Sequence, residues 1–165
     1  MKKIKFIVAA MIMAALVSCK PSPQEAANYN DSLMQQQKAL IIKYDELLKT
    51  FDTCIPSKMD AALFDLKDQI EWSKVEIENI VPINGGEDLR QELLNYVDFF
   101  GNIANDEFEF LVRVYKAREN ELSPEMRIQW AAKYKEIDTK IKDANKHLKE
   151  VQSVFANNYN LNIAK

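Results

Sequence analysis

Apolar residues recur every three or four positions in four long stretches of this chain. The stretches run over residues 26–51, 59–80, 89–115 and 126–155, and the polar positions between their apolar lines are rich in charge. A spacing of three and four places such residues on one face of an α-helix. Gln37 is the one polar residue on the first line, and a buried amide there needs a hydrogen-bond partner. The pattern therefore predicts four long amphipathic helices.

Signals for helix ends stand between these stretches. Ser22, followed by Pro23 and Glu25, and Ser123, followed by Pro124, each indicate a serine N-cap with proline in the first turn. Ser57 and Asp60 offer a further capping box. The segment 82–86 holds a proline and two glycines, which predicts a turn. Each connection between the helices is therefore expected to be short.

Short connections let four amphipathic helices bury their apolar faces only as antiparallel neighbours. We therefore expect an all-α fold, an up-down-up-down antiparallel four-helix bundle over residues 23–157, followed by a C-terminal tail at 158–165. An extended coiled-coil hairpin that dimerises is the main alternative. Only 3 glycines and 5 prolines occur in 165 residues, which favours long helices.

The N-terminus carries a different pattern. Lys2, Lys3 and Lys5 precede an apolar run from 6 to 16 that is short for a membrane span, and this layout is typical of a secretory signal. The run closes on residues 16–19, Leu-Val-Ser-Cys. This motif resembles the lipobox of bacterial lipoproteins. The resemblance implies removal of residues 1–18, a lipid on Cys19, and a linker of only 19–22. The alternative is an ordinary signal with an incidental cysteine.

The lipobox also bears on location. The resemblance implies a protein of the bacterial cell envelope, anchored to a membrane by the lipid on Cys19 and facing the periplasm or the cell surface. Lys20 follows Cys19, where some bacterial lipoproteins retained in the inner membrane have aspartate, so the outer membrane is favoured. Cys54 would then lack a partner in its own chain, and either burial or an intermolecular disulfide is open to it.

A second resemblance concerns the rest of the chain. Residues 28–37 (NYNDSLMQQQ) and 106–111 (DEFEFL) look like segments of a family of helical bacterial surface lipoproteins of unassigned function. The likeness implies a lipid-anchored helical bundle. It implies no activity and supplies no catalytic residue.

Charge narrows the choice of partners. Removal of residues 1–18 takes three lysines with it and leaves 19 Lys and Arg against 25 Asp and Glu. Nucleic acids and anionic lipids are held by clustered cations. The acidic balance therefore predicts that nucleic acid is not a partner.

Candidate chemistry is sparse. A carboxylate-bridged di-iron bundle needs two Glu-x-x-His motifs, whereas the chain has one histidine, His147. Haem-attachment, nucleophile-elbow and phosphate-loop motifs are also missing from the sequence. We therefore predict a protein that is not an enzyme, with no catalytic residue, no metal and no cofactor.

The third helix is more apolar than a bundle requires. Beside its core line runs a second apolar strip, so that the apolar arc covers about 220° of the helix, against about 100° for the fourth helix. Such width indicates either a surface for a protein partner or for self-association, or a helix that is central or covered by the tail. Glu107 lies between the two strips and is expected at a boundary that reaches solvent. The partner surface would consist of Trp72, Tyr96, Phe99, Ile103, Phe110 and Val114.

These observations are compatible with two functions. The first is a membrane-anchored envelope lipoprotein that acts as a non-enzymatic macromolecular binding or structural module. The alternative is a carrier of a small apolar ligand held between the helices, because bundle cores are common ligand sites.

Overall fold

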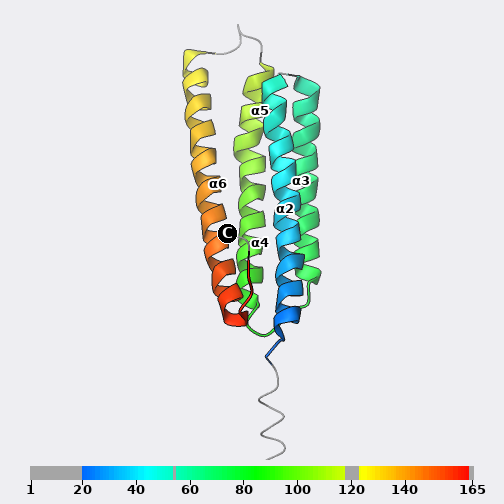
Figure 1. The fold of residues 1–165 in the computed structure, drawn as a ribbon. Coiled ribbons are helices and arrows are strands. Elements are labelled where there is room, and N and C mark those ends of the chain that lie inside the picture. Colours follow the sequence, from blue (N-terminus) through cyan, green and yellow to red (C-terminus); the bar gives the residue numbers. More distant parts are fainter. Residues whose placement is uncertain (1–19, 54, 118–122, 164–165) are drawn as a thin grey trace, which may run out of the picture.

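The computed structural model describes residues 20–53, 55–117 and 123–163. These residues form an all-α four-helix bundle without a strand, as the apolar pattern predicts (Figure 1). None of their helices combines the length and the apolar character needed to cross a bilayer. The helical elements in chain order are α2 (Pro23–Thr53), α3 (Pro56–Asn79), α4 (Glu87–Ile103), the π-helical segment η1 (Ala104–Phe108), α5 (Glu109–Lys116) and α6 (Pro124–Tyr159).

Successive rods run in opposite directions, with α4, η1 and α5 stacked as the third rod (Figure 1). Contacts at one end of the bundle fix this arrangement. The Tyr29 hydroxyl, near the start of α2, donates a hydrogen bond to the carbonyl of Gly86 over 3.0 Å. The Tyr159 hydroxyl, at the end of α6, donates to the carbonyl of Asn84. We call this end, where the turn 80–86 lies, the base.

The predicted serine caps are confirmed at two helices and wrong at a third. Ser22 and Glu25 form the expected capping box, in which the Ser22 amide donates to the Glu25 carboxylate over 2.8 Å and the Glu25 amide donates to the Ser22 hydroxyl. Ser123 accepts from the amide of Met126. At α3, however, the helix begins at Pro56, so Ser57 is already helical and cannot cap it.

Tight packing at the base involves Gly86. A Cβ on this residue would lie 2.7 Å from a ring carbon of Tyr29, so the Tyr29 ring fits against the turn only because glycine has no side chain. Burial raises the pKa of Tyr29 to about 12, with the Glu87 carboxylate as a smaller cause. The Tyr29 hydroxyl therefore stays protonated as a donor throughout the neutral range.

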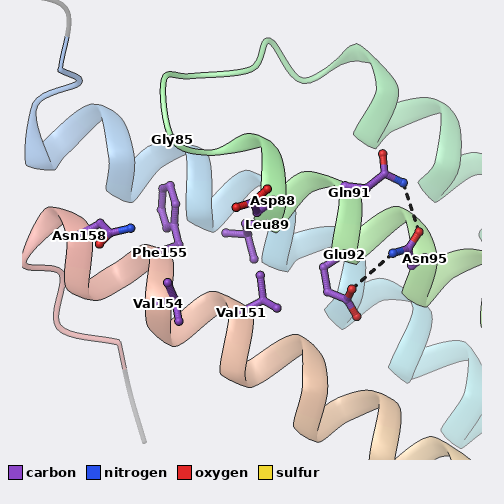
Figure 2. A pocket seen from close by; sticks show the side chains of 10 residues that line it. All are labelled: Gly85, Asp88, Leu89, Gln91, Glu92, Asn95, Val151, Val154, Phe155 and Asn158. Carbon is purple, nitrogen blue, oxygen red and sulfur yellow. Dashed lines mark hydrogen bonds between the residues drawn. The ribbon is translucent and has the colours of Figure 1, made fainter.

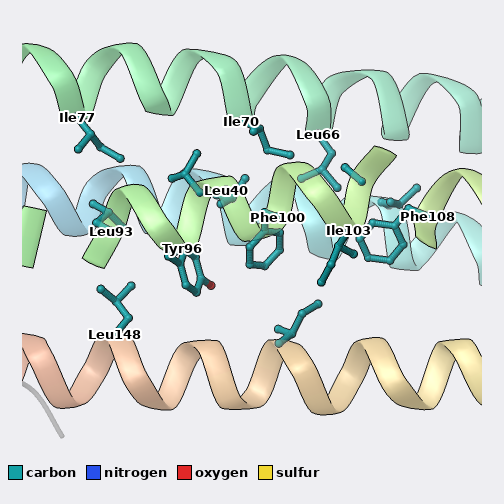
Figure 3. Close-up of a cluster of buried hydrophobic side chains, with 14 of the residues drawn as sticks. Leu40, Leu66, Ile70, Ile77, Leu93, Tyr96, Phe100, Ile103, Phe108 and Leu148 are labelled. Carbon is teal, nitrogen blue, oxygen red and sulfur yellow. The ribbon is translucent and has the colours of Figure 1, made fainter. Parts of the chain in front are cut away.

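The core follows the length of the bundle, and all four rods contribute to it (Figure 3). Most residues of the predicted apolar lines of α2, α3 and the third rod are buried, and Tyr44, Ile80 and Tyr115 are partly buried. Aromatic rings of the third rod lie at its centre, with Tyr96 and Phe100 5.0 Å apart between ring centroids. The largest fully buried side chains include Tyr96, Phe100, Phe108, Leu33, Leu40, Leu47, Met59, Leu66, Ile77, Leu89, Leu93 and Leu111.

The fourth helix extends past the bound predicted at residue 157. It ends at Tyr159, and Asn160 closes it in the left-handed conformation (φ 55°, ψ 40°). Tyr159, expected in the tail, is buried against the Phe155 ring. The asparagines at 157, 158 and 160 suggested an earlier end, but Tyr159 adds apolar contact at the base, which favours one more half-turn of helix.

Candidate functional site

Most of the predicted partner surface is buried within the protein itself. Tyr96, Ile103 and Val114 are only 2%, 2% and 5% exposed. Phe99 and Phe110 are half-buried and pack against the core. These five residues therefore form no open strip, which favours the alternative that this helix is central.

The third rod is apolar over a wide arc because it is central. It packs against α2, α3 and α6, so it needs apolar side chains on three sides. In addition, η1 uses the wider i→i+5 hydrogen-bond pattern, which takes up one more residue per turn and rotates the following helix by about 100° relative to an uninterrupted α-helix. The arc estimated from the sequence assumes an unbroken α-helix over residues 89–115. Because η1 interrupts that helix, the estimate is wider than the arc that is buried.

Trp72 is the exception among the predicted surface residues, because 61% of it is exposed. It lies on α3, apart from the other five, as do Phe64 and Val75, which are 69% and 51% exposed. Spacings of three and eight residues place these three side chains on one side of the helix. Their exposure could not be deduced from sequence, because apolar residues beside a core line are buried or exposed according to the neighbouring helices.

The exposed positions of α3 between residues 64 and 78 include no basic residue, and every charged residue among them is acidic. The two lysines in the middle of α3 are engaged elsewhere, since Lys74 contacts Asp98 of α4 at 2.7 Å and Lys67 contacts Glu109 of α5. The exposed side of α3 between residues 64 and 78 thus carries four carboxylates and no cation. We call this surface the α3 outer face, and it consists of Phe64, Asp65, Asp68, Glu71, Trp72, Val75 and Glu78.

A hollow of about 360 Å³ lies along this face between α2 and α3, lined by Trp72, two carboxylates, Gln69 and Lys43. Lys43 is paired, with its ammonium 2.8 Å from the Glu46 carboxylate and 3.7 Å from that of Asp65. The pairing with Glu46 is the main cause that raises the pKa of Lys43. The Asp68 carboxylate has no such partner among the described residues, so it can receive a cation from outside, with Trp72 available for a cation–π contact.

Glu107 is buried at 8% exposure, so its expected position at a boundary open to solvent is wrong. Its carboxylate is 3.0 Å from the ammonium of Lys140 and 3.9 Å from that of Lys133, both on α6. Lys140 also contacts Glu136 at 2.6 Å, and its pKa is raised by Glu136 first and by Glu107 second. The sequence of the third helix could not reveal these partners because they come from another rod.

A groove of about 370 Å³ runs between the first turns of α4 and the last turns of α6 (Figure 2). Its floor is apolar, with Leu89 and Phe155 buried and Val151 half-buried. Its rim is polar and carries two carboxylates, Asp88 and Glu92, together with amide side chains. The base therefore holds a second hollow of mixed character, on different helices from the α3 outer face.

Two further cavities lie between α5 and the first half of α6. One, of about 220 Å³, is lined by Val114, Tyr115 and Trp130 with Ala117 and Arg127. The other, of about 270 Å³, includes Phe110 of α5, and its α6 wall is formed by residues 129–136. Phe110 and Val114, both predicted as surface, therefore line cavities between helices.

Residues 20–53, 55–117 and 123–163 contain no group of three or more His, Cys, Asp or Glu side chains placed to hold a metal ion. His147 is 62% exposed at its side chain and contacts one carboxylate, that of Glu92, at 3.5 Å. Cys19, the predicted lipid site, and Cys54 lie outside the described residues, as does the predicted signal at 1–18.

Comparison of the chain with family models, with curated proteins and with solved structures finds no match. The class of the protein is therefore defined by its fold and by the chemistry of its surface. It is an all-α four-helix bundle, and its second helix presents an acidic and aromatic outer face.

Proposed function

We propose that the protein is a non-enzymatic binding module that holds a basic amphipathic segment of a macromolecular partner on the α3 outer face. The observation that carries this proposal is the coincidence of exposed apolar side chains, Phe64, Trp72 and Val75, with four exposed carboxylates, while the neighbouring lysines are already paired with carboxylates. Aromatic residues on a surface are strong anchors for a partner because they bury a large area at low entropic cost.

The sign of the charge selects the partner. Asp65, Asp68 and Glu71 repel a phosphate backbone or an anionic membrane, and they attract lysine and arginine. A basic helix that also has an apolar side can place that side on Phe64 and Trp72 while its cations reach the carboxylates. The partner is therefore proposed to be a protein segment and not a nucleic acid.

A titration with a designed peptide tests this proposal. The probe is an 18-residue amphipathic helix of leucine and lysine, and its counterpart has glutamate in place of lysine. We expect saturable binding of the lysine peptide alone, and a loss of about tenfold or more in affinity for Trp72→Ala, as truncation of an interface anchor produces. Ile128→Ala serves as the control, because Ile128 is 71% exposed on α6.

Two results would contradict the proposal. One is equal binding of the lysine and glutamate peptides, which would remove the electrostatic argument. The other is an unchanged affinity in the variant Phe64→Ser with Trp72→Ala when circular dichroism shows that it remains folded. Both side chains are mostly exposed, so their replacement leaves the core intact.

We also propose that the module is a bacterial envelope lipoprotein, held in the outer membrane by a lipid on Cys19. The motif at residues 16–19 supports the lipid anchor, and Lys20 in place of an aspartate after Cys19 favours the outer membrane. Labelling of expressing bacteria with radioactive palmitate tests the anchor. We expect label on the wild type and on Cys54→Ser but not on Cys19→Ser, and label that persists in Cys19→Ser would refute it.

A second candidate function is the carriage of a small apolar ligand between α5 and α6. The two cavities beside Phe110, Val114 and Trp130 favour it. Native mass spectrometry of the protein isolated under mild conditions tests this function. A bound low-mass species that is absent from Val114→Trp would support the carrier, whereas identical ligand-free spectra would count against it.

A further inference from the structure

We propose that the groove between α4 and α6 is a binding site for a small organic amine, that is, a protonated amino group attached to an aromatic or branched apolar body. The groove is separate from the α3 outer face, and this inference does not depend on the function proposed for that face. It rests on the volume of the groove, its apolar floor and the charges at its rim (Figure 2).

The shape of the groove suits a small molecule. Its volume of about 370 Å³ falls in the range of sites that take ligands of drug size. Leu89 and Phe155 are 1% and 3% exposed, so the floor is held rigidly by the core beneath it. Figure 2 shows Val151 and Phe155 extending from α6 toward Leu89 of α4. An apolar body placed here would cover Val151, which is partly exposed, and Val154, which is 61% exposed.

The rim determines the charge of the ligand. Asp88 and Glu92 stand one turn apart on α4, so their carboxylates share one side of the helix. Among the described residues, Asp88 has no ion pair or hydrogen bond. The residues that line the groove include these two carboxylates and no lysine or arginine. Lys20, which does not line the groove, donates to the carbonyl of Asn158 over 2.9 Å.

Glu92 is the central residue of the proposed site. Its side chain is only 17% exposed, yet its contacts are a long hydrogen bond of 3.4 Å from the Asn95 amide and the His147 ring at 3.5 Å. Burial of a carboxylate is unfavourable unless a cation or several donors compensate for the lost water. A ligand ammonium at this point would supply the missing cation, and the apolar floor would then hold the body beside it.

The neighbouring amides refine the geometry. The Gln91 side chain donates to the Asn95 oxygen over 3.2 Å, and Asn95 donates in turn to Glu92, so the three form a chain along the rim (Figure 2). This chain orients the Glu92 carboxylate. It also leaves His147, which is 62% exposed, as the contact that an incoming amine would displace.

Binding of 2-phenylethylammonium to the full-length protein, followed by isothermal titration calorimetry, tests the inference. The comparison ligands are 2-phenylethanol, which lacks the charge, and 3-phenylpropionate, which reverses it. We expect saturable binding of the amine, binding of the alcohol that is weaker by about tenfold or more, and no binding of the acid. We further expect Glu92→Gln to lose about tenfold in affinity for the amine, because the ion pair is replaced by a neutral contact.

Glu150→Gln is the matched control. Glu150 is exposed on α6, pairs with Lys146 and does not line the groove, so the same change there should leave affinity unaltered. Thermal unfolding of both variants checks that the bundle is intact. The inference is overturned if the amine fails to bind at millimolar concentration, if the acid binds as well as the amine, or if folded Glu92→Gln binds like the wild type.

Discussion

The two halves of α6 have the same apolar pattern but differ in burial. In Pro124–Glu136, every residue of which the structure describes, no side chain is fully buried, and Ile128 is 71% exposed. In the second half, Ile137, Leu148 and Phe155 are all buried. The first half lies beside α5 with two cavities between them, whereas the second half packs against α4 and the base.

The difference shows what an amphipathic pattern determines. It specifies which side of a helix faces its neighbours, and in both halves of α6 the aromatic and aliphatic line does face them. It does not specify how closely the neighbours approach. In the first half, Trp130 meets the Tyr115 ring edge to face at 5.2 Å between centroids, and Lys133 lies 3.9 Å from the Glu107 carboxylate.

The largest expected effect comes from Phe155 in the packed half. Its ring lies 5.8 Å from that of Tyr29 and 5.0 Å from that of Tyr159, measured between centroids. Phe155→Ala should lower the free energy of unfolding by roughly 3–5 kcal/mol. Ile128→Ala, in the open half, should change it by less than about 0.5 kcal/mol. Urea denaturation measures both, and equal losses would show that the halves are equally packed.

A smaller effect is expected from Glu107, which joins the third rod to α6 near the boundary between its two halves. Glu107→Gln removes the ion pairs with Lys140 and Lys133 but leaves both lysines able to reach solvent, so a loss of about 1–2 kcal/mol is expected. Hydrogen exchange should locate the loss around residues 133–140, with little change in 148–159. Uniform loss along α6 would contradict an anchoring role confined to residues 133–140.

The smallest expected effect is a loss of stability in the open half of α6 at low pH. The pKa of Glu136 is lowered by Lys140 first and by Lys133 second. A carboxylate whose pKa is lowered on folding contributes stability above its ordinary pKa of 4.5 and loses that contribution as the pH falls through the lowered value. Protection of the amides in the open half, corrected for the intrinsic exchange rate, should therefore fall below about pH 4.5, and Glu136→Gln should abolish the change. If the wild type and Glu136→Gln lose protection equally at low pH, the Glu136 carboxylate is not the cause.

Sequence reasoning predicted the fold well because local signals determine it. The three-and-four spacing, the serine caps at Ser22 and Ser123 and the turn at 82–86 each act within a few residues, and the structure confirms all of them. The cap expected at Ser57 failed because Pro56 already occupies the first helical position. Serine favours the cap and proline the first helical position after it, and the reversed order at 56–57 lets only proline take its favoured place.

The sites could be predicted only in part because they depend on neighbours in space. Trp72 was named as a surface residue and is exposed, but Tyr96 and Ile103 were assigned to the same surface and are buried. Whether an apolar residue beside the core line is covered depends on the number of rods around its helix. Glu92 has no sequence signal at all, since its position in the groove results from the approach of α6 to α4.

Contacts at the base also determine how the bundle would respond to mechanical force. The Lys20 ammonium and the Asn158 carbonyl are 2.9 Å apart, so a pull between residues 20 and 163 acts at one end of the bundle. Such a load separates helices from that end, one contact after another, and does not slide them along their full length. The hydrogen bond from Tyr159 to Asn84 would carry the load early, and the open half of α6 would be the last part to feel it.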